Sequence, residues 1–112
     1  MLYASVEDVK QRIGYLPASN FGFSSEAAFE SYIQILIRGA SRLIDAECNV
    51  EDGEFAENTP DLIRNIAADA VAIFLMKAQK FLQNRENPPS LMLLPEQRDA
   101  LKRYKTFKFE RG

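Results

Sequence analysis

From Leu62 to Leu82 the chain carries an apolar pattern that fills well over half of a helical wheel. A helix that faces water on one side usually carries lysine and glutamate on that side. Here the remaining stripe is mostly small or uncharged, and its members are Asn65, Ala68, Asp69, Ala72, Gln79 and Gln83. We therefore expect a helix that packs on nearly all sides. In a short chain this indicates either a central helix or a helix that also contacts another subunit.

The chain has 112 residues, which is enough for one domain with one modest core. We expect this domain to span 1–112, with its core in 3–84 and a C-terminal helix and tail in 95–112. The apolar fraction of 46% and the charged fraction of 27% are those of an ordinary globular protein. Arg64 and Asp69, with two lysines further on, make the apolar segment too polar to span a bilayer, so we expect no membrane partner.

The absence of histidine removes the commonest general base and the commonest metal ligand. The single cysteine, Cys48, excludes an intrachain disulfide. The acidic stretch after it has the wrong spacing for a calcium loop, because with Gly53 in the sixth position the closing acid would fall on Thr59. We expect no catalytic residue, no cofactor-binding residue and no metal ligand.

Cap and turn residues divide the chain into four expected helices. Ser5 caps the first and Ser25 the second. Thr59 and Pro60 begin the third, and Pro95 begins the fourth. The expected helices span 5–14, 25–47, 59–84 and 95–104. The sequence therefore predicts an all-α fold, a small bundle of two long antiparallel helices with two shorter helices.

The tail, residues 106–111, alternates apolar and charged side chains, a period that is typical of a short strand. A lone strand has no partner inside a helical domain. The tail is therefore expected either to be disordered or to add to a neighbouring molecule.

Charge is distributed unevenly along the chain. The stretch 45–61 has seven acids and no base, whereas 95–112 has six bases against three acids. These stretches are either two solvated surfaces or complementary patches that meet between copies of the protein.

Several residues are candidates for a subunit or partner interface. Gly39 lies in a patch of small residues in the second helix, where another helix could come close. Ile35 lies off the core stripe of that helix and is either an ordinary surface residue or a subunit contact. The complete set of candidates is Ile35, Gly39, Ala68, Ala72, Lys102, Arg103, Lys105, Phe107 and Phe109.

Asp69 is the one acid inside the strongly apolar third helix. An unpaired carboxylate at the edge of a core is costly, so we expect a specific partner. We predict Arg42 of the second helix as that partner, because a guanidinium can bind two carboxylate oxygens. Both residues are then structural.

The order of elements resembles that of the head–tail connector proteins, also called head-completion or adaptor proteins, of long-tailed bacteriophages and prophages. The sharpest piece is the phrase Leu-Ile-x-x-Ala-Ser-x-x-Ile-Asp at 36–45. A short helix opening with Ser5-Val6-Glu7-Asp8 precedes it, and the proline-started helix 60–70 follows it. The resemblance covers roughly 3–83.

This resemblance implies a non-enzymatic structural protein of the virion, made in the bacterial host cytoplasm and located at the head–tail junction. It implies a homo-oligomeric ring, of twelve subunits in that family, which docks on the portal protein and offers a surface to a tail-side completion protein. Contact with DNA would be incidental, in the channel. A head-to-tail interface that closes into a ring suits a subunit with patches of opposite sign.

Two other classes stay open. The basic C-terminal region, with its interleaved aromatic residues, would suit a small helical nucleic-acid-binding or regulatory module. Against it, Glu96 and Asp99 bring acids into the first turn of the helix that would read DNA. A small hydrolase has only Asp69 in its favour.

Overall fold

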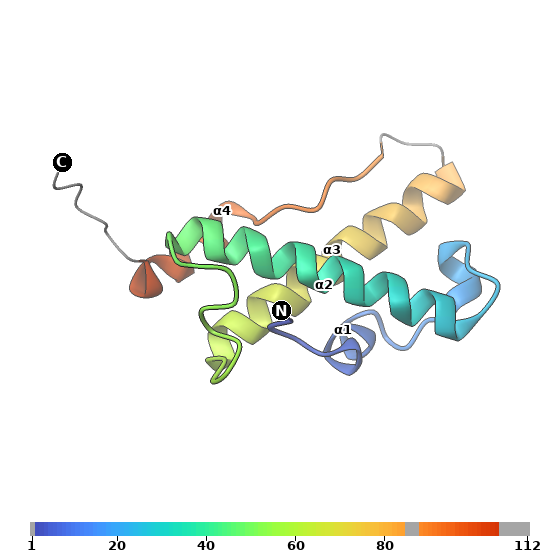
Figure 1. The fold of residues 1–112 in the computed structure, drawn as a ribbon. Coiled ribbons are helices and arrows are strands. Elements are labelled where there is room, and N and C mark those ends of the chain that lie inside the picture. The colour runs from blue at the N-terminus through green and yellow to red at the C-terminus, as the bar shows by residue number, and fades with distance from the viewer. Residues whose placement is uncertain (1, 85–87, 106–112) are drawn as a thin grey trace, which may run out of the picture.

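The computed structural model describes residues 2–84 and 88–105. This part of the chain is helical and contains no strand, in agreement with the all-α prediction (Figure 1). The helices are α1 (Val6–Arg12), α2 (Glu26–Cys48), α3 (Asp61–Asn84) and α4 (Pro95–Ala100), with 3₁₀ helices η1 (Ala18–Phe21) and η2 (Leu101–Tyr104). The tail 106–111, whose alternating pattern is typical of a short strand, lies outside the described residues, and so do Phe107 and Phe109 within it.

Local sequence sets where the first two helices begin. Ser5 and Asp8 form a capping box, in which each side chain accepts a hydrogen bond from the backbone N–H of the other residue. Ser25 caps α2 by accepting from the N–H of Ala28 at 3.1 Å. Thr59 was expected to cap α3, but its hydroxyl donates instead to the carbonyl of Phe55 at 2.7 Å.

The segment after α1 is more ordered than the loop that the sequence predicts. Gly14 and Tyr15 both take the left-handed conformation, with φ of 67° and 58°, and so reverse the chain. The chain then forms η1, whose Phe21 ring stacks on Phe29 of α2 at a centroid distance of 4.9 Å. Phe23 also packs on Phe29, so the aromatic residues fasten this segment to α2.

The core lies where α1, α2 and α3 meet. The buried apolar residues of the two long helices are Phe29, Ile33, Leu36, Ile37, Ala40, Ile44, Cys48, Ile63, Ile66, Ala67, Ala68, Ala70, Val71, Ala72 and Leu75. Both α1 and α2 pack against α3, so the first half of α3 is covered by its own chain. Towards its end α3 exposes Met76 and Leu82.

The core extends beyond residue 84, which corrects the expected boundary. The segment 88–94 runs back from the end of α3 to α4, as the orange trace in Figure 1 shows. Leu93 from this segment and Leu101 from η2 are both buried in the core. These two leucines cover apolar surface of the core that the two long helices do not bury against each other.

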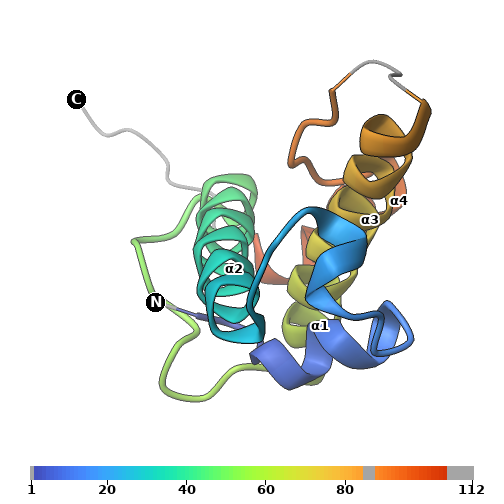
Figure 2. The same cartoon turned by 90° about the vertical axis from the view of Figure 1, so that its right-hand side faces the viewer.

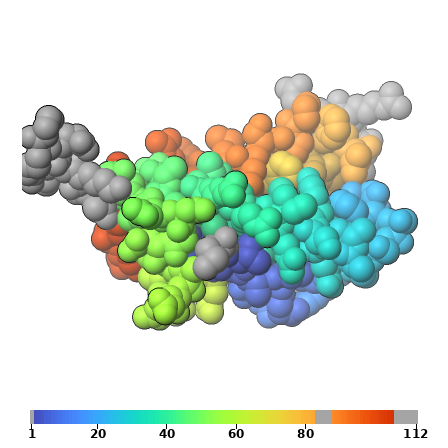
Figure 3. Space-filling view, viewed as in Figure 1, coloured from blue at the N-terminus to red at the C-terminus, as the bar shows by residue number. Residues whose placement is uncertain are grey.

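The turned view shows two opposite sides of the molecule. The chain between α2 and α3 lies on one side of α2, while α3 and α4 lie on the other (Figure 2). In the space-filling view the same segment, in green, forms part of the front face (Figure 3). A surface on this segment and a surface on the outer side of α3 therefore face away from each other.

Candidate functional site

A buried hydrogen-bond network holds the chain between α2 and α3. The Tyr3 hydroxyl donates to Oδ1 of Asp45 and accepts from the N–H of Phe55 at 3.2 Å. Oδ2 of Asp45 accepts from the N–H of Gly53 at 2.9 Å. Tyr3 is 2% exposed and Asp45 is 5% exposed, so these bonds are shielded from water. Burial, and then the bond to Asp45, raise the pKa of Tyr3.

This network fixes an acidic loop, which we define as residues 51–57. The ring of Phe55 packs edge-on against Tyr3 and Tyr104, at centroid distances of 5.8 and 5.7 Å. Four exposed carboxylates surround this anchor, and they belong to Glu51, Asp52, Glu54 and Glu57. None of the four forms an ion pair with a described residue. The acidic loop is thus a negatively charged surface on a backbone that is held in place.

The sequence identified the acids of this loop but not its anchor. The missed residues are Tyr3 and Asp45. A signal was present, because Asp45 lies four residues after Ser41 and eight after Ile37, on the buried face of α2. A carboxylate on such a face requires donors, although the sequence does not indicate that Tyr3 supplies one.

A groove of about 600 Å³ runs along the outer side of α3, between the end of α1 and the start of α4. We call it the α3 groove. Its lining residues are Arg12, Asp69, Ala72, Ile73, Met76, Lys77, Lys80, Leu94, Glu96 and Gln97. Ile73 and Met76 leave apolar surface open in it. Lys77 and Lys80 are exposed, and neither forms an ion pair with a described residue.

Asp69 has a partner, but the partner is not Arg42. Nε of Arg12 donates to Oδ1 of Asp69 at 2.6 Å, and Nη2 of Arg12 donates to Oδ1 of Asn65 at 2.9 Å. The predicted pair is wrong because the guanidinium that reaches Asp69 comes from α1, which packs against α3. Arg42 points to solvent from the other side of α2. The Asp69 side chain is 50% exposed, so it is a surface pair and not an edge-of-core group.

Three predicted interface residues are occupied by their own chain. Ala68 is 0% exposed and Ala72 is 7% exposed, so neither offers much surface to another subunit. A Cβ at Gly39 would stand 2.9 Å from Cδ2 of Leu91, which shows that the small-residue patch receives segment 88–94 of the same chain. Ile35, by contrast, is 59% exposed.

The basic C-terminal region meets acids inside the chain. Nε of Arg98 donates to Oε1 of Glu47 at 3.0 Å, which joins α4 to the end of α2. Lys102 pairs with Asp99 at 2.8 Å, and this bond raises the pKa of Lys102. Arg103 and Lys105 are exposed. Part of the positive charge of the C-terminal region is therefore neutralised by carboxylates of the same chain.

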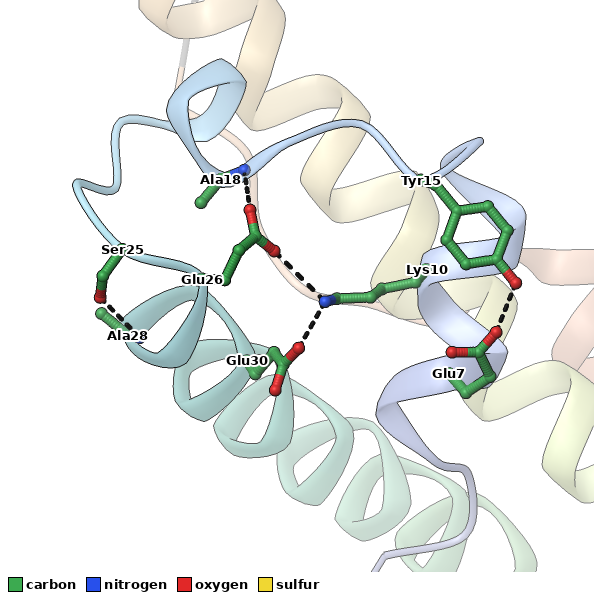
Figure 4. Close-up of polar contacts among 8 residues, drawn as sticks. All are labelled: Glu7, Lys10, Tyr15, Ala18, Ser25, Glu26, Ala28 and Glu30. Atoms are coloured by element: carbon green, nitrogen blue, oxygen red, sulfur yellow. Dashed lines mark hydrogen bonds and ion pairs between the residues drawn. The ribbon is translucent and has the colours of Figure 1, made fainter.

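A second polar cluster ties α1 to the start of α2 (Figure 4). Nζ of Lys10 lies between the carboxylates of Glu26 and Glu30, and the bond to Glu30 is the main cause of a raised Lys10 pKa. Glu26 also accepts from the N–H of Ala18 at 2.7 Å, which lowers the pKa of Glu26. The cluster fixes the segment between the two helices and leaves no group poised for chemistry.

Nothing in the described residues gathers into a reactive centre. Cys48 is 0% exposed, and burial raises its pKa to about 11, so its thiol is unreactive at neutral pH. No group of three or more acids or cysteines in 2–84 and 88–105 is arranged to hold a metal ion. Within the same residues, no helix combines the length and the apolar character needed to cross a bilayer.

We compared the chain with protein-family models, with curated proteins and with solved structures, and none of the three comparisons gave a match.

Proposed function

We propose that this protein is a non-enzymatic structural component of a bacteriophage head–tail junction, one that assembles into a ring on the portal protein and presents a surface to a tail-side completion protein. The proposal starts from the resemblance carried by the phrase at 36–45 and by the order of the helices around it. An antiparallel pairing of the two long helices, a ring of twelve subunits and a location in the virion are parts of this same proposal.

The observation that carries the proposal is the pair of opposed surfaces. The acidic loop lies on one side of α2, and the α3 groove lies on the side of the molecule that faces away from it (Figure 2). A subunit with different, complementary surfaces on opposite sides associates head to tail. Such contacts generate a ring when the rotation between subunits closes.

The described residues also give little support to catalysis. Every buried side-chain nitrogen or oxygen in this part of the chain has a hydrogen-bond partner, so none is left directed at a missing substrate. Asp69, the residue that favours a hydrolase, is paired with Arg12 and half exposed. An assembly role fits these surfaces better than an enzyme does.

Electron microscopy of the purified protein over a wide concentration range tests the proposal. Closed rings, formed at high concentration or on a portal ring, are the expected result. Discrete two-fold dimers would contradict it and would favour a regulatory protein. Sedimentation of the same samples gives the mass of the assembled species independently of the images.

The second candidate is a nucleic-acid-binding module. The exposure of Arg103 in η2 and of Lys105 directly after it favours this candidate. The ion pairs Arg98–Glu47 and Lys102–Asp99 weaken it, because these cations are already matched by carboxylates. Binding of a labelled DNA duplex that weakens steeply with salt, and that is lost on Arg103→Glu, would support this candidate.

A further inference from the structure

We propose that the acidic loop of one copy docks on the edge of the α3 groove of the next copy, with Lys77 and Lys80 as its counter-charges. This inference rests on the proposed function, since it specifies the surfaces through which the ring would form. It replaces the C-terminal Lys102 and Arg103, which the sequence favoured, with two cations on α3.

The cations of the groove are available for a partner. Arg12 already binds Asp69, and among the described residues Lys77 and Lys80 have no carboxylate partner. The two lysines are three positions apart on a helix, so their side chains lie on neighbouring turns of one face. They form one cationic edge beside the apolar surface of Ile73 and Met76.

The loop has the matching properties. Its four carboxylates lack ion-pair partners among the described residues, and the Tyr3–Asp45 network fixes the backbone that carries them. A fixed loop loses little conformational freedom when it binds. Ala56 in the loop and Val50 directly before it, both half-buried, add apolar surface that can face Ile73 and Met76. Glu96, at the α4 edge of the groove, disfavours an approach from that side and directs the loop to the lysines.

The geometry makes the contact intermolecular. The loop and α3 face away from each other in the turned view, so the loop cannot reach the groove of its own chain (Figure 2). Each copy then uses its loop towards one neighbour and its groove towards the other. A single contact between one short loop and one groove buries little surface and is weak. Closing a ring gives each subunit two contacts at once, so assembly depends strongly on concentration.

Charge reversal of each surface is the test. The loop variant carries Glu51→Lys, Glu54→Lys and Glu57→Lys. The groove variant carries Lys77→Glu and Lys80→Glu. The control matched to the groove variant carries Arg38→Glu and Arg42→Glu, which change the charge by the same amount as that variant but on exposed residues of α2. Far-ultraviolet circular dichroism and thermal melts establish that each variant is folded.

We expect either interface variant alone to raise the dissociation constant for self-association by at least about tenfold, because attraction is replaced by repulsion. The control should assemble as the unmodified protein does. A mixture of equal amounts of the loop variant and the groove variant should assemble again, because every loop–groove pair between the two variants has opposite charges. Sedimentation velocity at low salt measures the unmodified protein, the two interface variants, the control and the mixture.

The outcomes separate the two proposals. If the unmodified protein forms rings and neither variant changes them, the loop–groove contact is wrong and the ring proposal stands. If the mixture regains association but the images show filaments or dimers, the contact stands and the connector proposal falls. A protein that stays monomeric at millimolar concentration, alone and on a portal ring, overturns both.

Discussion

The guanidinium of Arg12, at the end of α1, lies 2.6 Å from Asp69 on α3, across 57 positions of sequence. This bond and the one to Asn65 hold the short first helix against the long third helix at the edge of the α3 groove. The pair is partly exposed, with side-chain exposures of 27% for Arg12 and 50% for Asp69. Its contribution to stability is therefore in the range of surface ion pairs.

Asp69→Asn should lower the free energy of unfolding by no more than about 1 kcal/mol, because water replaces much of the lost interaction. Urea unfolding of Arg12→Ala, Asp69→Asn and the double variant gives the coupling between the two residues. Arg42→Ala is the control and should leave stability unchanged. Coupling of Asp69 to Arg42 in place of Arg12 would contradict the arrangement described here.

Gly39→Ala should be close to neutral by itself. Alanine favours a helix over glycine by about 1 kcal/mol, but the new Cβ would stand 2.9 Å from Cδ2 of Leu91 and displace that side chain. In a Leu91→Ala background the clash is absent, and the same substitution should stabilise by about 1 kcal/mol. Thermal melts of the four proteins measure the difference. Equal effects in both backgrounds would show that Leu91 does not cover Gly39.

Tyr3→Phe should destabilise the protein by about 1–3 kcal/mol at neutral pH, because Asp45 and the N–H of Phe55 each lose a buried partner. The pH dependence is a second signature. The pKa of Tyr3 is raised in the folded protein, so its contribution is complete below its ordinary pKa of 10.0 and is lost as the pH rises above that value.

Denaturant unfolding between pH 8 and 11 checks this dependence. The unmodified protein should lose stability more steeply above pH 10 than Tyr3→Phe does. The Lys10 pKa is also raised, so part of the alkaline loss should persist in the variant. Parallel curves for the two proteins would show that the tyrosine hydroxyl is not buried against Asp45.

Leu101→Ala should lower the free energy of unfolding by about 2–5 kcal/mol, the usual cost of emptying a fully buried leucine site. It should also expose Cys48, whose sulfur lies 4.0 Å from the carbonyl oxygen of Leu101. The rate of labelling by a thiol reagent at pH 8 reports this opening. Met92→Ala, at a side chain that is 53% exposed, is the control and should leave the rate unchanged.

Local chemistry made the helices predictable. Ser5 and Ser25 each accept a hydrogen bond from a backbone N–H three residues further along the chain. These caps do not depend on the rest of the fold. The apolar stripes of α2 and α3 were equally readable, because helical periodicity is a local property of the sequence. The expected boundaries of the long helices agree with the structure to within about two residues.

Long-range pairings were not predictable in the same way. The partner of Asp69 depends on how α1 packs against α3, and helical periodicity contains no such information. Gly39 presents a similar case. Because Gly39 has no side chain, another helix or any other segment could approach it closely. That Leu91 is the residue in contact follows from the path of residues 88–94.

The return of segment 88–94 across the long helices has a consequence for how the protein is made. Leu91 packs beside Gly39 and Leu101 lies beside Cys48, so residues that follow α3 complete the core on that side. In a nascent chain that has emerged only as far as α3, the face of α2 around Gly39 and Cys48 is still exposed to water. During synthesis the intermediate therefore exposes apolar surface until residues 88–104 have left the ribosome, and premature termination after α3 yields a product prone to aggregate.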